Sequence, residues 1–139
     1  MNSILSISPF KQQNGLHETR SWYPINRMNY NRSSVHMAVV GRKLYALGGM
    51  LDGGYASLVE MYDAEDDNWI EVDPMSQARC NPGIAVAGGK IYVVGGLGEN
   101  LLGPPGPLKT VEYYDVRMIS NSLVKWFCIQ CIIKSTTFI

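Results

Sequence analysis

The segment Lys43-Leu-Tyr-Ala-Leu-Gly-Gly49 recurs in the same chain as Lys90-Ile-Tyr-Val-Val-Gly-Gly96, 47 residues later. Both copies have an initial lysine, a central tyrosine between apolar residues, and a terminal pair of glycines. A period near 50 residues with paired glycines is typical of propeller and solenoid repeats. A unit of this kind cannot bury its own faces. It therefore needs neighbouring units, and it usually presents loops to a partner.

The repeat extends in both directions from these two segments. Upstream, the pairs that keep the same offset are Trp22 and Trp69, Met28 and Met75, and Arg32 and Arg79. Downstream, Val59-Glu-Met-Tyr-Asp63 recurs as Val111-Glu-Tyr-Tyr-Asp115, now at an offset of 52 because of a five-residue insertion. The two copies therefore share one plan from residue 22 to residue 115.

Each copy predicts short antiparallel strands in the arrangement of a propeller blade. The first two strands form a hairpin around a glycine-containing turn, and they are expected at 35–40 and Lys43–Leu47, then at Gly83–Ala87 and Lys90–Val94. The third strand is expected at 58–62 and 111–114, and the fourth at 69–72. The loops 50–57 and 97–110 differ in length between the copies and are expected on the surface.

This pattern resembles the Kelch repeat, and the two segments from lysine to the double glycine resemble the blades of Kelch-like proteins. The first copy carries the resemblance in Tyr45, Gly48, Gly49, Tyr62, Asp63, Trp69, Pro74, Met75 and Arg79. The matching repeat positions elsewhere are Trp22, Tyr92, Gly95, Gly96, Tyr114 and Asp115. The resemblance covers about two thirds of the chain. It implies an all-β fold, namely a partial Kelch β-propeller of about two four-stranded antiparallel blades that does not close.

Three regions are expected along the chain. Residues 1–21 lack the repeat and are expected to be a disordered N-terminal segment. Residues 22–115 hold the repeats: one terminal strand, one full blade over about 34–72, and one incomplete blade of three strands over about 83–115. Because propellers use about four to eight blades, the isolated chain leaves faces unpaired. We expect it to be weakly folded, aggregated or dependent on another chain.

The tail 116–139 is interpreted as non-repeat sequence. It contains no glycine, proline or acidic residue, and Trp126 comes five residues later than the repeat requires. The dipeptide Val116-Arg117 can be encoded by a sequence that resembles an intron donor site. The tail is therefore attributed to intron read-through or to a truncated gene model.

Composition limits the classes of partner. Residues 44–116 carry eleven acidic and three basic residues, which argues against a nucleic-acid-binding surface. The stretch 123–139 is too short and too polar to span a bilayer, so no membrane partner is expected. The three cysteines, Cys80, Cys128 and Cys131, form no disulfide framework. Their number favours a reducing compartment, and we expect a cytoplasmic location.

No motif for catalysis or metal binding stands out. The chain has only two histidines, His17 and His36, and the pair Cys128-x-x-Cys131 supplies two of the four ligands that structural zinc requires. The acidic run 63–67 lacks the glycine and the distal glutamate of a calcium-binding EF-hand loop. We therefore predict a protein that is not an enzyme and that uses no cofactor and no metal.

The resemblance to Kelch-like propellers implies a protein partner. In that family the loops after the double glycines and the loops between blades lie on one face, where partners dock. The candidate partner-binding residues are Arg32, Arg79, Asn81, Asp52, Tyr55 and Asn100. An arginine at this face can hold an acidic peptide bidentately. The alternative for both arginines is a structural hydrogen bond to backbone carbonyls between blades.

The resemblance leaves three functions open. The first is the substrate-recognition propeller of a cullin ubiquitin ligase adaptor, with cullin a partner only if a longer parent protein contains a BTB domain. The second is binding to actin or another part of the cytoskeleton. The third, a remote alternative, is a fragment of a propeller oxidase that uses a copper radical. That chemistry needs cysteine, tyrosine and histidine ligands, and the scarcity of histidine argues against it.

Overall fold

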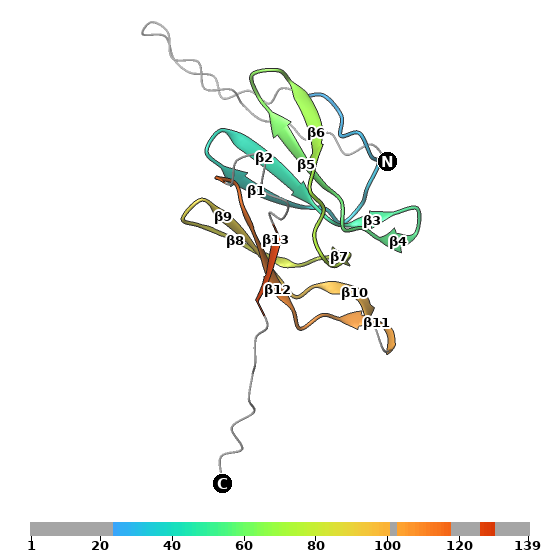
Figure 1. The fold of residues 1–139 in the computed structure, drawn as a ribbon. Coiled ribbons are helices and arrows are strands. Elements are labelled where there is room, and N and C mark those ends of the chain that lie inside the picture. Colours follow the sequence, from blue (N-terminus) through green and yellow to red (C-terminus); the bar gives the residue numbers. More distant parts are fainter. Residues whose placement is uncertain (1–23, 101–102, 118–125, 130–139) are drawn as a thin grey trace, which may run out of the picture.

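Two four-stranded antiparallel sheets pack against each other in the computed structural model, which describes residues 24–100, 103–117 and 126–129 (Figure 1). The first sheet contains, in spatial order, β1 (His36–Val40), β2 (Lys43–Leu47), β5 (Val59–Asp63) and β6 (Asn68–Val72). The second contains β8 (Gly83–Ala87), β9 (Lys90–Val94), β12 (Val111–Asp115) and β13 (Trp126–Ile129). The described residues form no helix. The prediction of an all-β fold with propeller-type sheets is confirmed.

The central strand β2 shows why these residues form a sheet that is buried on both faces. Side chains alternate along a strand, so Tyr45 and Leu47 point to one face while Leu44 and Ala46 point to the other. All four are at most 6% exposed. A strand covered on both faces reads as a nearly continuous apolar run, as this one does. The turn that follows β8 contains Gly88 and Gly89, whose φ angles of 56° and 71° suit a type I′ turn.

A short hairpin follows the double glycine in each copy, where the sequence predicts only surface loops. In the first copy it consists of β3 (Met50–Leu51) and β4 (Gly54–Tyr55). In the second it consists of β10 (Leu97–Asn100) and β11 (Gly103–Pro107). The segment that precedes each sheet joins the hairpin: Ser33 pairs with Met50, and β7 (Arg79–Cys80) pairs with β10. These backbone bonds hold the hairpins in place beside the sheets.

The second sheet has a fourth strand, whereas the sequence predicts only three strands there and places Trp126 outside the repeat. Strand β13 pairs with β12, with Trp126 opposite Tyr114. The indole N–H of Trp126 donates to the carbonyl of Asp73 at 2.7 Å, just as Trp69 donates to Asn26 at 2.8 Å. The Tyr–Trp ring distances are 5.2 and 5.3 Å in the two sheets. Trp126 is therefore the structural counterpart of Trp69.

The sequence does not predict strand β13 because the connection between β12 and β13 is longer than the one between β5 and β6. Eleven positions separate Asp115 from Trp126, against six between Asp63 and Trp69. Lengthening a connection changes its closure entropy only slowly, so the same strand pairing tolerates the extra residues. A fixed spacing is thus a poor guide to whether a strand joins a sheet.

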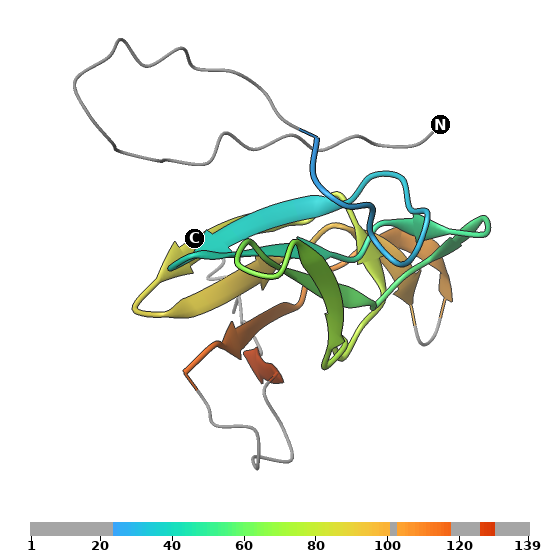
Figure 2. The ribbon, with the colours of Figure 1, turned by 90° about the horizontal axis from the view of Figure 1, so that it is seen from above.

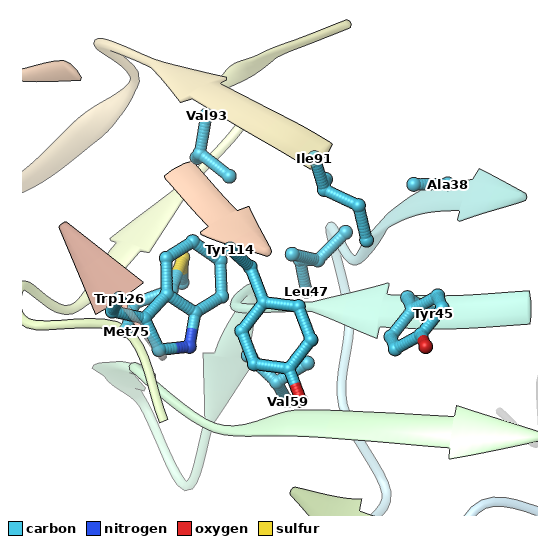
Figure 3. Packing of buried hydrophobic residues seen from close by; sticks show 9 residues of the cluster. All are labelled: Ala38, Tyr45, Leu47, Val59, Met75, Ile91, Val93, Tyr114 and Trp126. Carbon is cyan, nitrogen blue, oxygen red and sulfur yellow. The ribbon is translucent and has the colours of Figure 1, made fainter. Parts of the chain in front are cut away.

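The main core lies between the two sheets (Figures 2 and 3). It is lined from both sides by Ala38, Tyr45, Leu47, Val59, Met75, Ile91, Val93, Tyr114 and Trp126. A second cluster, Leu44, Ala46, Tyr62 and Trp69, occupies the opposite face of the first sheet. Part of the segment that precedes β1 covers this second cluster through Ile25, Met28 and Val35. Trp22 lies outside the described residues.

Candidate partner-binding surface

Arg32 lies beneath the first sheet and is removed from solvent. Its Nη1 donates to the carbonyls of Gly48 at 2.7 Å and Leu58 at 3.0 Å, and its Nη2 donates to Glu60 at 2.7 Å. The side chains of this ion pair are both 0% exposed. Glu60 also accepts the backbone N–H of Asn29 at 2.7 Å, so its charge is met from two sides. The pair anchors the preceding segment to the first sheet.

Arg79 repeats this arrangement in the second sheet. Its Nη1 donates to the carbonyl of Gly95 at 2.7 Å, and its Nη2 donates to Glu112 at 2.7 Å and to the Thr110 hydroxyl at 3.0 Å. Glu112 additionally accepts the backbone N–H and the hydroxyl of Ser76 at 2.8 and 2.7 Å. The Arg79 and Glu112 side chains are 1% and 0% exposed. A buried ion pair persists only when its remaining polar atoms are also bonded, as most are here.

These contacts correct the prediction that Arg32 and Arg79 contact a partner. Neither guanidinium reaches the surface, so neither can hold an acidic peptide. The alternative, in which each arginine is a structural residue that donates to backbone carbonyls, describes them better. The carbonyls come from the repeat unit that follows each arginine and not from a neighbouring unit.

The glutamates Glu60 and Glu112 were missed by the sequence interpretation. The signal was present, since in both copies a glutamate recurs inside the third strand, directly after an apolar valine and away from the turn. A charge buried in a strand needs an opposite charge, and a repeated arginine is the natural candidate.

The double glycines let the segment between the sheets approach closely. Gly48, Gly49, Gly95 and Gly96 all have positive φ, between 60° and 98°. A side chain at Gly48 would meet the carbonyl of Arg79, and a side chain at Gly49 would come within 2.5 Å of the Ser33 carbonyl. Only glycine combines this backbone conformation with such close contacts.

The aspartates that end the third strands shape the next turn. Asp63 accepts the backbone N–H of Glu65 at 3.0 Å, and Asp115 accepts that of Arg117 at 3.1 Å. The hydrogen bond from Glu65 lowers the pKa of Asp63. The pKa of Asp115 falls to about 2, mainly because the Arg117 side chain donates hydrogen bonds to it. Both aspartates therefore bond the turn backbone, and each also pairs with a cation, Lys43 at 3.5 Å for Asp63 and Arg117 at 3.0 Å for Asp115.

The remaining predicted residues lie on a surface formed by the two hairpins and the segment between the sheets, which we call the hairpin surface. Figure 1 shows both hairpins on the same side of the molecule as β7. Asp52 is exposed at the tip of β3–β4, and Tyr55 is half-buried in β4. Asn81 is exposed directly after β7, and Asn100 is exposed at the end of β10. The elements that carry or adjoin these four residues thus lie on one side of the molecule, whereas the two arginines are buried.

The second hairpin has the more rigid outline. Strand β11 contains Pro104, Pro105 and Pro107, which have fixed φ and no backbone donor. The side chain of Asn100 donates to the carbonyl of Pro104 at 2.9 Å and ties the two strands together. Prolines on an edge strand also discourage pairing with another strand. This hairpin therefore suits recognition by side chains rather than by strand addition.

The described residues hold no group of three or more histidine, cysteine or acidic side chains that could bind a metal. Cys80 is buried and Cys128 is exposed, both as free thiols, and Cys131 lies outside the described ranges. In the part of the chain that the structure covers, no helix has the length and apolar character needed to cross a membrane.

Comparison with known proteins gives one family. The family model described as the Kelch motif matches residues 31–76 and 78–118, which together make up more than half of the chain. Each match begins one residue before a buried arginine and includes the glutamate that pairs with it. No curated protein matches the chain significantly.

Proposed function

Since the chain belongs to the Kelch-repeat family, we propose that it binds another protein through the hairpin surface and catalyses no reaction. Kelch repeats are β-propeller units that generally serve protein interaction. The observation that carries the proposal is the gathering of Asp52, Tyr55, Asn81 and Asn100 on one side of the two sheets. The buried ion pairs hold this side in position without exposing a charge.

The chemistry of the hairpin surface favours a polar partner segment with an aromatic or aliphatic anchor. Tyr55 offers a ring with a polar tip, and Asn81 and Asn100 offer both donors and acceptors. Leu97 is 39% exposed and adds an apolar contact beside them. Aromatic residues at the centre of a polar surface commonly carry most of the binding energy.

The test compares variants of the hairpin surface with a matched variant at the far end of the first sheet. Affinity capture with the full chain is followed by quantitative mass spectrometry for wild type, Tyr55→Ser, Asn100→Ala and Arg42→Ala. Arg42 lies in the turn between β1 and β2 and its side chain is 83% exposed. We expect the hairpin variants to lose the same binding partner about tenfold, as the loss of a central contact of about 1.4 kcal/mol implies. Equal loss in Arg42→Ala would contradict the proposal.

We further propose that, in a longer parent protein in the cytoplasm, this surface recruits substrates to a cullin ubiquitin ligase. The support is the likeness to Kelch-like blades, and cullin itself would be contacted through a BTB domain rather than through these repeats. BTB coding sequence upstream in the full-length transcript and cullin in the captured material are the expected results. Co-sedimentation with actin filaments, without either, would replace this proposal by cytoskeletal binding.

A further inference from the structure

The second sheet has an open face whose counterpart in the first sheet is buried. Ile91 and Val93 of β9 point into the core between the sheets, so Tyr92 and Val94 point away from it. Val94 is 46% exposed and Tyr92 is half-buried. On the same face, Tyr113 lies 5.6 Å from Tyr92 and 5.0 Å from Phe127, measured between ring centroids. This open face is thus an aromatic and aliphatic surface.

The repeat shows what covers such a face. The first-sheet counterparts of Tyr92 and Val94 are Tyr45 and Leu47, which are 4% and 0% exposed. They are covered by residues of the second sheet, and Tyr45 lies 5.9 Å from Tyr114. In the interface between the two sheets, this face of the first sheet is therefore covered by the opposite face of the sheet that follows it.

The first sheet carries a surface equivalent to that covering one. Leu44, Ala46 and Tyr62 occupy the positions of Ile91, Val93 and Tyr114. They are 6%, 0% and 5% exposed, because the partly buried side chains of Ile25, Met28, Val35 and Met37 pack on them and are what this side of the sheet presents. Beside them lies a cavity of about 220 Å³. The side chains around it are Asn26, Met28, Arg32, Ser34, Val35, Met37 and Trp69. We call this side of the first sheet the entry face.

Backbone groups reinforce the match between the two faces. Within the chain, the N–H of Gly49 donates to the Arg79 carbonyl at 2.9 Å, and the N–H of Arg79 donates to the Ala56 carbonyl at 3.1 Å. The equivalent groups are the N–H of Gly96 and the carbonyl of Leu108 on the open side, and both backbone groups of Arg32 on the entry side. Among the described residues, these four groups make no backbone hydrogen bond. An interface that removes these groups from solvent would have to pair them, as the contact between the two sheets pairs the Gly49 N–H and the Arg79 carbonyl.

We propose that the open face of the second sheet binds the entry face of a second copy of this chain, repeating the interface between its own two sheets. The contact places Tyr92 against the partly buried Met28, Val35 and Met37 of the second copy. It also aligns the Gly96 N–H with the Arg32 carbonyl. The two faces differ, so the contact is heterologous, and it continues from copy to copy until a ring closes. Propellers contain about four to eight blades. If each copy contributes the two sheets of the described residues, a closed ring holds about two to four copies.

Complementation between two damaged faces provides the test. Val94→Lys damages the open face and Met37→Lys damages the entry face, and each variant is studied by sedimentation velocity over a range of concentrations. We expect the wild-type chain to form a discrete assembly of several copies, and each variant alone to associate at least about tenfold more weakly, because the interface would bury an unpaired charge. A mixture of the two variants keeps one intact face of each kind, and it should form a one-to-one dimer and nothing larger.

The matched control is Ile70→Lys. Ile70 is 44% exposed, close to the 46% of Val94, and it lies in β6 on the side of the first sheet that is not part of the entry face. This variant should assemble as wild type does. Near-ultraviolet circular dichroism checks the fold of each variant, and Val35→Lys replaces Met37→Lys if the latter unfolds.

Three results would overturn the proposal. A folded wild-type chain that stays monomeric at every concentration removes the assembly. Association that Ile70→Lys weakens as much as Val94→Lys does shows non-specific aggregation. Failure of the two folded variants to form a dimer when mixed shows that the contact is not head-to-tail. Val94, Met37 and Ile70 lie in strands of the two sheets and none belongs to the hairpin surface, so the loss of assembly in these variants is separate from the loss of partner binding in the hairpin variants.

Discussion

The first and second sheets have nearly the same sequence pattern but very different surroundings on one face. Leu47 is 0% exposed and its counterpart Val94 is 46% exposed. Tyr45 and Ala38 are buried, whereas Tyr92 is half-buried and Ala85 is exposed. The residues are of the same kind in both copies, but among residues 24–100, 103–117 and 126–129 only the first sheet has a following neighbour. In a repeat of this kind, one face of each sheet is therefore buried only by the next sheet.

The ion pairs behave in the opposite way. Arg32–Glu60 and Arg79–Glu112 are equally short, at 2.7 Å, and equally buried. Each pair is enclosed by its own sheet and by the segment that precedes that sheet, so its burial does not depend on the next sheet along the chain. Some features of the repeat are thus complete within one unit, and others need two.

The largest effect is expected from the tryptophans that define the fourth strands. Trp69→Ala and Trp126→Ala should each lower the free energy of unfolding by roughly 3–5 kcal/mol, because each removes a buried aromatic ring. Urea denaturation followed by circular dichroism, at one fixed protein concentration, measures both. A loss below about 0.5 kcal/mol for Trp126→Ala alone, typical of a surface substitution, would separate β13 from the sheet.

The next effect concerns the buried ion pairs. Glu60→Ala and Glu112→Ala should each cost about 3 kcal/mol, because an uncompensated guanidinium is left buried. The double variant Arg79→Leu with Glu112→Leu should cost less than the sum of its single variants, since it leaves no lone charge. The same denaturation experiment gives all of these values. Additive costs would mean that the two side chains do not interact.

A smaller effect tests the neighbour directly with two matched valines. Val59 is 0% exposed, and its counterpart Val111 is only half-buried on the open face. Val59→Ala should cost about 2 kcal/mol, from two lost methylene equivalents and a cavity, and Val111→Ala less than about 1 kcal/mol. Equal costs in a monomer would show that the second sheet does not protect Val59. At concentrations where copies associate, the two costs should converge.

The smallest effect is a difference in titration between the two turn aspartates. A carboxyl group whose pKa is lowered by folding stabilises the protein above its unfolded pKa, which is about 3.9 for aspartate. For Asp115 this contribution is lost as the pH falls from about 4 through its folded pKa of about 2. Nuclear magnetic resonance titration should show Asp115 protonating near that value.

The control for this titration is Arg117→Ala. The substitution removes the side-chain hydrogen bonds from Arg117, so the pKa of Asp115 should rise, while the pKa of Asp63 should not move. An unchanged Asp115 would assign the low pKa to the turn backbone or to Lys90 instead. The unfolding midpoint of the wild-type protein should fall as the pH falls from about 4 to about 2, because the stabilisation by ionised Asp115 is lost over this range.

Much of the fold can be predicted from local patterns in the sequence. The strands β2, β8 and β9 occupy the predicted ranges because an apolar run bounded by glycine turns is a local signal. The fourth strand β13 could not be predicted, because its position depends on pairing across a connection of unusual length. Of the candidate site, the exposed hairpin residues could be placed from their loops. The arginines could not, because a side chain in a loop can turn inward as easily as outward.

By itself, the sequence determined the repeat, the alternation of side chains along each strand, and the positions where only glycine fits. These depend on interactions between residues that are close along the chain. The tertiary structure alone decided that Arg79 is buried against Glu112, that Trp126 completes a sheet, and that Val94 is open while Leu47 is closed. Burial is a property of what lies next to a residue in space, and equivalent positions with different neighbours therefore differ.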